Sequence, residues 1–299
     1  MKHMAGVPRT PEEAEATPKK RHVLFDHPIL TEIVMVVLFA VLANGIVMAL
    51  YAAGLTFEGM TKELVTTGVA IVSAILVTLF FQLRFHKEFD GMFGWSSFGL
   101  VLALPALLFV MSNLFSIETM QFTFLNPEVT VNPIGISLFM AMAPGISEEL
   151  LFRGIPASNW MRTAKDEGTV IKCVIITSVL FGLVHGVNAL AGAAISATLF
   201  QVFYATCLGL LFCTVFLRTG SIWPTIIVHT LIDFSGFLFM NMDQMGIITE
   251  ELTIGPDFYA AVGISVALIV FTIIMLRGSK REEIMELWRS KWNKADFNW

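Results

Sequence analysis

The sequence predicts an all-α, polytopic integral membrane protein with about eight transmembrane helices and both termini in the cytoplasm. Hydrophobic residues make up 56% of the 299 residues and charged residues only 14%, proportions far outside those of soluble globular domains. Apolar stretches long enough to cross a bilayer recur along the chain. The lipid bilayer is therefore the first expected partner, and no nucleic-acid partner is expected.

Three parts are expected along the chain. Residues 1–28 combine prolines with mixed charge and lack the apolar run of a secretory signal peptide, so they are expected to form a disordered cytoplasmic tail. Residues 29–278 are expected to form the transmembrane domain, with its charged motifs at about 140–240. Residues 279–299 read as a basic, amphipathic cytoplasmic tail, which either lies along the anionic membrane surface or ends the chain as a solvated helix.

Eight apolar segments define the predicted transmembrane helices, at about 29–54, 63–83, 97–116, 134–156, 169–187, 189–217, 222–240 and 258–276. All Lys and Arg residues except Lys62 and Arg153 fall in the tails or near loops on one side of these segments. Two loops on the opposite side, 117–133 and 241–257, contain no Lys or Arg. Because Lys and Arg favour cytoplasmic loops, an even number of spans with both termini in the cytoplasm is predicted.

Three charged residues interrupt the fourth apolar segment: Glu148, Glu149 and Arg153. A charge at the bilayer centre costs roughly 2.5–3.5 kcal/mol on insertion scales, so such residues are usually functional or firmly paired. Glu149 and Arg153 are spaced i, i+4 in the order that favours an ion pair on one helix face. Glu148 points about 100° away from that face, and without a partner on its own helix it is the better general base.

Two further apolar segments each carry a pair of motif residues at i, i+4 spacing: Phe181 with His185, and His229 with Asp233. Counted from the nearest cytoplasmic Lys or Arg, four polar residues lie at a similar depth of roughly 16–23 Å: Glu148, His185, His229 and Asp233. We therefore expect them to meet at one level, near the membrane midplane or slightly to its cytoplasmic side. Pro156 is expected to kink the end of the fourth span.

The motifs EExxxR, FxxxH and HxxxD, in this order on separate helices, resemble the three motifs of the CAAX protease and bacteriocin-processing family, also called the CPBP or Abi family. The resemblance covers about residues 140–240. It implies an intramembrane glutamic endopeptidase that cuts near the cytoplasmic leaflet without a metal or other cofactor. The implied substrate is a hydrophobic or lipidated peptide or protein, and the expected location is a prokaryotic plasma membrane.

The resemblance also implies a role for each motif residue. Glu148 with His185 activates water, His229 with Asp233 stabilises the oxyanion, and Glu149 with Arg153 orders the site beside Phe181. Asp233 departs from the eukaryotic prenyl proteases of this family, which carry Asn at this position. An ionised Asp would repel an oxyanion, so Asp233 must either be protonated or act by orienting a histidine.

Three alternatives to this interpretation stay open. The histidines and carboxylates are acceptable zinc ligands in number and kind, although HExxH is absent, so a zinc-dependent intramembrane protease is one alternative. Intramembrane carboxylates and histidines also form proton relays in transporters, which is the second. The third is a non-catalytic membrane scaffold or immunity protein that retains the fold.

Overall fold

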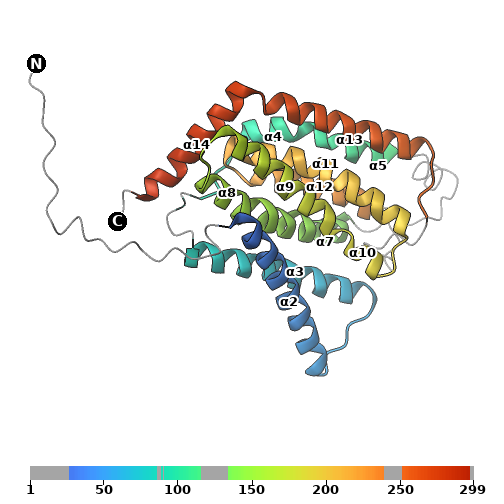
Figure 1. Cartoon of the computed structure of the whole chain (residues 1–299). Helices are drawn as coiled ribbons and strands as arrows, with labels where there is room; N and C mark the ends of the chain where they lie inside the picture. Colours follow the sequence, from blue (N-terminus) through green and yellow to red (C-terminus); the bar gives the residue numbers. More distant parts are fainter. Residues whose placement is uncertain (1–26, 86–88, 90, 116–133, 239–250, 297–299) are drawn as a thin grey trace, which may run out of the picture.

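The computed structural model describes residues 27–85, 89, 91–115, 134–238 and 251–296. Every regular element in these ranges is a helix, which confirms the all-α prediction (Figure 1). The elements are α2 (Pro28–Ala52), α3 (Gly59–Phe85), α4 (Ser97–Ala103), the 3-10 turn η2 (Leu104–Ala106), α5 (Leu107–Phe115), α7 (Ile134–Glu148), the π-helix η3 (Glu149–Ala157), α8 (Ser158–Arg162), α9 (Glu167–Val184), α10 (Val187–Leu190), α11 (Ile195–Thr219), α12 (Trp223–Phe237), α13 (Pro256–Met275) and α14 (Gly278–Asp296). Most of the predicted N-terminal tail and all of the loop 117–133 lie outside the described residues.

Seven helical stretches of the described residues are long and apolar enough to cross a membrane, which confirms a multi-span protein. They are Pro28–Ala52, Gly59–Phe85, Ser97–Phe115, Ile134–Arg162, Glu167–Leu190, Ile195–Thr219 and Pro256–Met275. The remaining predicted span, 222–240, contains α12, whose 15 residues extend about 22 Å. That length is shorter than a hydrocarbon core of about 30 Å, which explains why α12 is not counted among the seven.

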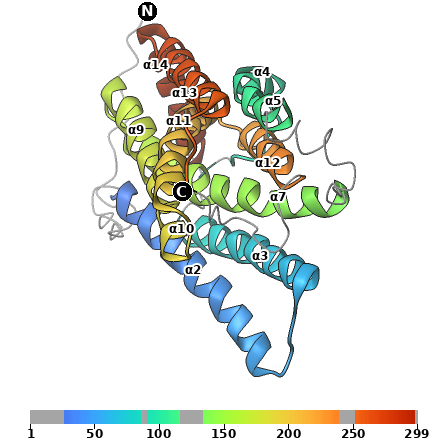
Figure 2. The same cartoon turned by 90° about the vertical axis from the view of Figure 1, so that its right-hand side faces the viewer.

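The alternating helices bring the basic residues to one end of the bundle, which we call the cationic end and define by Arg84, Arg162, Lys172, Arg218 and Arg277. Ion pairs connect helix termini there: Arg281 Nε lies 2.9 Å from Glu167 Oε2, and Arg218 Nη2 lies 3.5 Å from Glu283 Oε2. The opposite end, which we call the α10 end, holds α10 and the first turns of α11 and α13 (Figure 1). Helix α3 packs along α7, and only the end of the α2–α3 hairpin where the two helices are connected extends away from the other helices (Figures 1 and 2).

Helix α14 packs against the bundle at the cationic end. Trp288 is 1% exposed, donates its Nε1–H to the carbonyl of Leu217 at 2.8 Å, and stacks on Phe89 with ring centroids 5.7 Å apart. Lys291 Nζ donates to the Gly91 carbonyl at 2.9 Å. The sequence predicted that this tail lies either along the membrane surface or in solvent, and either position would leave its apolar side chains outside the bundle. The structure instead buries them, because aromatic side chains of other segments are available to cover them.

Glycines allow the motif helices to approach closely. A Cβ at Gly145 would overlap the hydroxyl of Thr230 on α12, and a Cβ at Gly182 would overlap the hydroxyl of Thr206 on α11. A Cβ at Gly209 would lie 3.1 Å from Arg153 Nη2. These small residues therefore bring α7 against α12 and α9 against α11, and they leave room for the arginine.

Candidate active site

The first motif lies where α7 changes into the π-helix η3. All nine residues of η3, from Glu149 to Ala157, are buried, and Pro156 lies inside this segment. Proline has no N–H to donate within a helix, and short π segments occur frequently at functional sites. The helical path nevertheless continues through α8 to Arg162. The change in winding thus falls on the charged motif itself, and not only near Pro156 as the sequence suggested.

A fully buried ion pair forms the inner part of the site. Glu149 Oε1 lies 3.0 Å from Arg153 Nη1, and both side chains are 0% exposed. The same carboxylate oxygen lies 2.9 Å from Nδ1 of His229 on α12, a distance at which the ring N–H donates to the carboxylate. Glu149 therefore connects the arginine of η3 to the histidine of the third motif.

Phe181 covers this pair from α9. Arg153 Cζ lies 4.0 Å from the centre of the Phe181 ring, a cation–π contact. The ring is 2% exposed and packs edge-on against His185 and His229, with centroids 5.2 and 5.9 Å apart. Phe181 thus holds the guanidinium and both imidazoles in place and does not face lipid.

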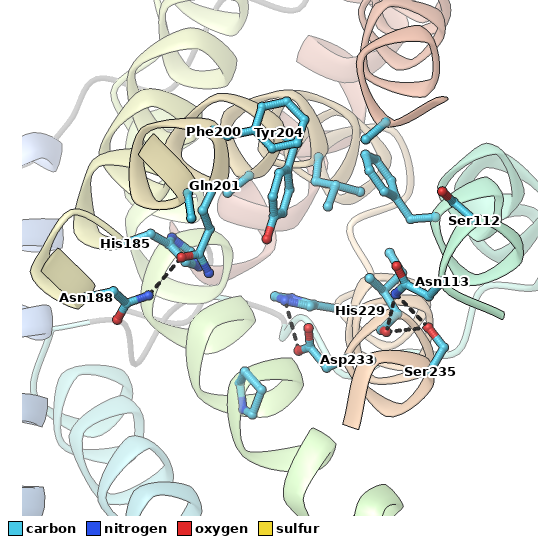
Figure 3. Close-up of a pocket in the computed structure, with 18 of the residues that line it drawn as sticks. Ser112, Asn113, His185, Asn188, Phe200, Gln201, Tyr204, His229, Asp233 and Ser235 are labelled. Carbon is cyan, nitrogen blue, oxygen red and sulfur yellow. Dashed lines mark hydrogen bonds and ion pairs between the residues drawn. The ribbon is translucent and has the colours of Figure 1, made fainter. Parts of the chain in front are cut away.

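The outer part of the site contains two carboxyl groups and two imidazoles. Glu148 Oε2 lies 4.0 Å from His185 Nε2 and 3.6 Å from His229 Nε2. Asp233 Oδ2 lies 3.4 Å from the same His229 nitrogen (Figure 3). The side chains of Glu148 and Asp233 are 24% and 25% exposed, whereas that of Glu149 is inaccessible. Of the three motif carboxyl groups, those of Glu148 and Asp233 are therefore the ones that a ligand in the cavity can reach.

Backbone contacts fix the orientation of His185. Its Nδ1 lies 2.9 Å from the carbonyl of Phe181, and because a carbonyl only accepts, Nδ1 carries the proton in this contact. The other nitrogen, Nε2, then faces Glu148. His229 is held in the same way by Glu149, so in both rings Nδ1 is engaged and Nε2 is turned toward the accessible carboxyl groups.

A cavity of about 760 Å³ lies between α5, α7, α9, α10, α11, α12 and α13. Its lining includes Glu148, His185, His229 and Asp233. The wall is largely aromatic and aliphatic, with Phe109, Phe200, Phe212 and Phe258 among its members. A cavity of this size with a few convergent polar groups is the usual form of a small-molecule or peptide site. Among the described residues, no group of three or more His, Cys, Asp or Glu has a spacing that would hold a metal ion.

The comparison with protein-family models identifies the central segment. Residues 130–235 match the family described as Rce1-like, type II CAAX prenyl endopeptidase Rce1-like. This match confirms the family predicted from the three motifs. The Rce1-like segment runs from the start of α7 through most of α12. A search of curated proteins gave no significant match.

All seven predicted site residues lie in the Rce1-like segment, and the structure brings all seven together. The family supports a multi-pass membrane endopeptidase in general terms. Helices outside the segment complete the cavity wall, through Phe109 of α5 and Phe258 of α13. The site is therefore shared between the Rce1-like segment and the helices that flank it.

Sequence reasoning missed Tyr204 on α11. Its hydroxyl points into the cavity toward His229 (Figure 3), and it interacts electrostatically with Asp233 and Glu148. Its ring packs against Phe109 and Phe200, with centroids 5.8 and 5.6 Å apart. A single tyrosine in an apolar helix, outside any motif spacing, gives no signal in the sequence beyond being one of only 3 tyrosines in the chain.

Polar residues on neighbouring helices also line the cavity. Asn188 donates to Gln201 Oε1 at 2.9 Å, and Asn113 of α5 donates to the hydroxyl of Ser235 at 2.9 Å. Each pair joins two helices across the cavity wall. In the sequence, these four residues differ from their neighbours only in being polar side chains inside apolar spans.

Proposed function

We propose that the protein is an intramembrane endopeptidase that hydrolyses a peptide bond of a hydrophobic or lipidated, membrane-associated substrate with a water molecule activated by Glu148. One observation carries the proposal: the accessible Glu148 carboxylate faces two oriented imidazoles in a largely apolar cavity. The separations of 4.0 and 3.6 Å exceed a direct hydrogen bond, and Glu148 Oε2 has no hydrogen-bond partner among the described residues. Its capacity to accept a hydrogen bond from a water is therefore not used by either imidazole.

In the proposed reaction, Glu148 accepts a proton from this water while the water oxygen attacks the carbonyl carbon of the scissile bond. The carbonyl electrons move to its oxygen, which becomes the oxyanion. His229, as an imidazolium that also keeps its Nδ1–H on Glu149, donates a hydrogen bond from Nε2–H to that oxyanion, and a protonated Asp233 donates a second. The oxyanion then collapses, the C–N bond breaks, and Glu148 returns its proton to the leaving amine. His185 orients the water, while Glu149 and Arg153 keep His229 in position.

The proposal is tested by incubating the purified protein with short hydrophobic and prenylated peptides and identifying products by mass spectrometry. Cleavage at internal bonds, in the presence of a strong chelator, is the expected result. Loss of activity on chelation that is reversed by added zinc would favour the zinc-protease alternative instead. Absence of products from every peptide would favour a transporter or a non-catalytic scaffold.

Asp233→Asn is expected to keep most of the activity and to extend it to higher pH. An amide donates a hydrogen bond at any pH, whereas Asp233 donates only while protonated. Asp233→Ala is expected to lose about 10²–10³ in turnover, the usual effect of removing one oxyanion donor. The measurement is kcat across the pH range for all three proteins. An Asn variant that is inactive throughout would mean that Asp233 acts as an anion that holds His229.

Tyr204→Phe is expected to lower kcat with little change in KM. The hydroxyl points toward His229 (Figure 3) and interacts electrostatically with Asp233 and Glu148. It can therefore serve as a further oxyanion donor, and deleting such a donor costs about 10²–10³ in turnover. The ring and its packing are retained in Phe. Tyr259→Phe is the matched control, because Tyr259 is 65% exposed on α13. Equal activity of the two variants would remove Tyr204 from the mechanism.

A further inference from the structure

Helix α2 buries a carboxyl group that the proposed reaction does not use. Only four of its 25 residues are buried, and they lie on one face of its first turns: Pro28, Thr31, Glu32 and Met35. Glu32 is 1% exposed, and neither of its carboxyl oxygens has a hydrogen-bond partner among the described residues. A buried carboxyl group is costly in apolar surroundings unless other groups compensate it.

Arg153 has N–H donors that Glu149 leaves unused. Its Nη1 lies 3.0 Å from Glu149 Oε1, whereas Nε and Nη2 have no hydrogen-bond partner in the part of the chain that the structure describes. Glu32 interacts electrostatically with this guanidinium. It also interacts with the thiols of Cys173 and Cys213, but a thiol supplies no positive charge. Unused donors and unused acceptors therefore belong to two groups of opposite charge type in one buried cluster.

The packing of α2 holds Glu32 beside the first motif. Helix α2 contacts η3, and Met35 belongs to the same apolar core as Phe152 of η3 (Figures 1 and 2). Asn159 of α8 donates from Nδ2 to Thr31 Oγ1 at 3.2 Å. The residues on either side of Glu32 on this face are thus tied to the segment that carries the charged motif.

Charge balance gives the Glu32 carboxyl group a role. Glu149 Oε1 lies 3.0 Å from Arg153 Nη1 and 2.9 Å from His229 Nδ1, and the proposed reaction uses His229 as an imidazolium. Two buried cations then share one buried carboxylate, which leaves an excess of positive charge away from water. Glu148 is not a fixed counter-ion, because in the proposed reaction its negative charge passes to the substrate oxyanion.

We propose that Glu32 is a second counter-ion of Arg153 and thereby a positioning residue for His229. With Glu32 as a carboxylate, two buried negative charges balance the guanidinium and the imidazolium. The positioning role rests on the proposed function, whereas the coupling between Glu32 and Arg153 does not. Glu32 lies outside the Rce1-like segment of residues 130–235, so the match to the family assigns it no role.

A double-variant cycle in melting temperature tests the coupling without requiring hydrolysis. In the full-length protein in detergent, Glu32→Gln and Arg153→Met are each expected to lower the melting temperature by several degrees, because each leaves one buried charge unbalanced. The variant that combines both substitutions removes one charge of each sign, and it is expected to melt above either single variant. Glu58→Gln, the same change at an exposed position between α2 and α3, should have no effect.

Two results would overturn the coupling. One is an unchanged melting temperature of Glu32→Gln, which would mean that the side chain carries no charge that matters. The other is a double variant in which the two losses add, which would mean that Glu32 and Arg153 act independently. If Arg153→Met does not fold, folding of the double variant is the same rescue, and failure of both to fold overturns the coupling as well.

Steady-state kinetics on a cleaved peptide tests the positioning role. Glu32→Gln is expected to lower kcat about ten-fold or more and to leave KM within about two-fold, because it acts on His229 and contacts no substrate. Glu32→Asp keeps the charge and should recover part of kcat. A kcat of Glu32→Gln equal to that of Glu58→Gln would overturn the positioning role. Absence of hydrolysis by every variant counts against the proposed function, and the melting-temperature cycle still decides on the coupling.

Discussion

Glu148→Gln is expected to abolish hydrolysis and leave the protein folded and inserted. Gln keeps the volume of the side chain but does not accept a proton from water, and a positioned general base contributes roughly 10²–10⁴ in rate. The side chain is 24% exposed and faces the cavity, so its substitution strands no buried charge. Product formation from a cleaved peptide, followed by mass spectrometry, measures the effect.

Glu286→Gln is the matched control for this variant. It makes the same chemical change on an exposed position of α14, away from the cavity, and its activity should equal that of the unsubstituted protein. Circular dichroism and gel filtration in detergent report whether each variant is folded. More than a few per cent of residual activity in a folded Glu148→Gln protein would reject Glu148 as the base.

Glu149→Gln is expected to destabilise the protein as well as inactivate it. The carboxylate bonds both Arg153 and His229 with no exposure to solvent, and removing one member of a buried pair typically costs about 3–5 kcal/mol. The neutral amide leaves the guanidinium uncompensated and loosens the imidazole. The measurement is the melting temperature in detergent together with turnover, and an unchanged melting temperature would contradict this account of the pair.

A double variant separates the two consequences. Glu149→Leu combined with Arg153→Met removes both charges, and replacing a buried ion pair by apolar residues is often neutral or stabilising. Stability is then expected to recover relative to Glu149→Gln. Turnover should stay low, because His229 Nδ1 has lost its carboxylate. Recovery of turnover together with stability would show that Glu149 contributes only to folding.

The sequence predicted the inner contacts of the site well because they follow from spacing within single helices. The i, i+4 pair of Glu149 and Arg153 is present at 3.0 Å, and Asp233 lies 3.4 Å from His229 one helical turn away. The charge pattern along the chain likewise marked one end of the bundle. In each case the cost of isolated charges in an apolar segment limits the arrangements that are possible.

Contacts between different helices were harder to predict from the sequence than contacts within one helix. The hydrogen bond from His229 to Glu149 and the position of Tyr204 depend on how α11 and α12 pack against η3, which hydrophobic periodicity does not specify. A membrane depth counted from the closest basic residue assumes that each helix starts near that residue. His229 instead lies in the second turn of α12 and His185 at the far end of α9. Their common position thus arises from staggered helices, which the sequence does not specify.

The most direct test of the central claim is hydrolysis by the purified protein in H₂¹⁸O, with chelator present, followed by mass spectrometry of the products. The account predicts two fragments from one internal bond, with ¹⁸O in the new carboxylate, from the unsubstituted protein and from Glu286→Gln. It predicts no fragments from Glu148→Gln. Equal cleavage by a folded Glu148→Gln protein, or a covalent acyl adduct on the protein during turnover, would contradict water activation by Glu148.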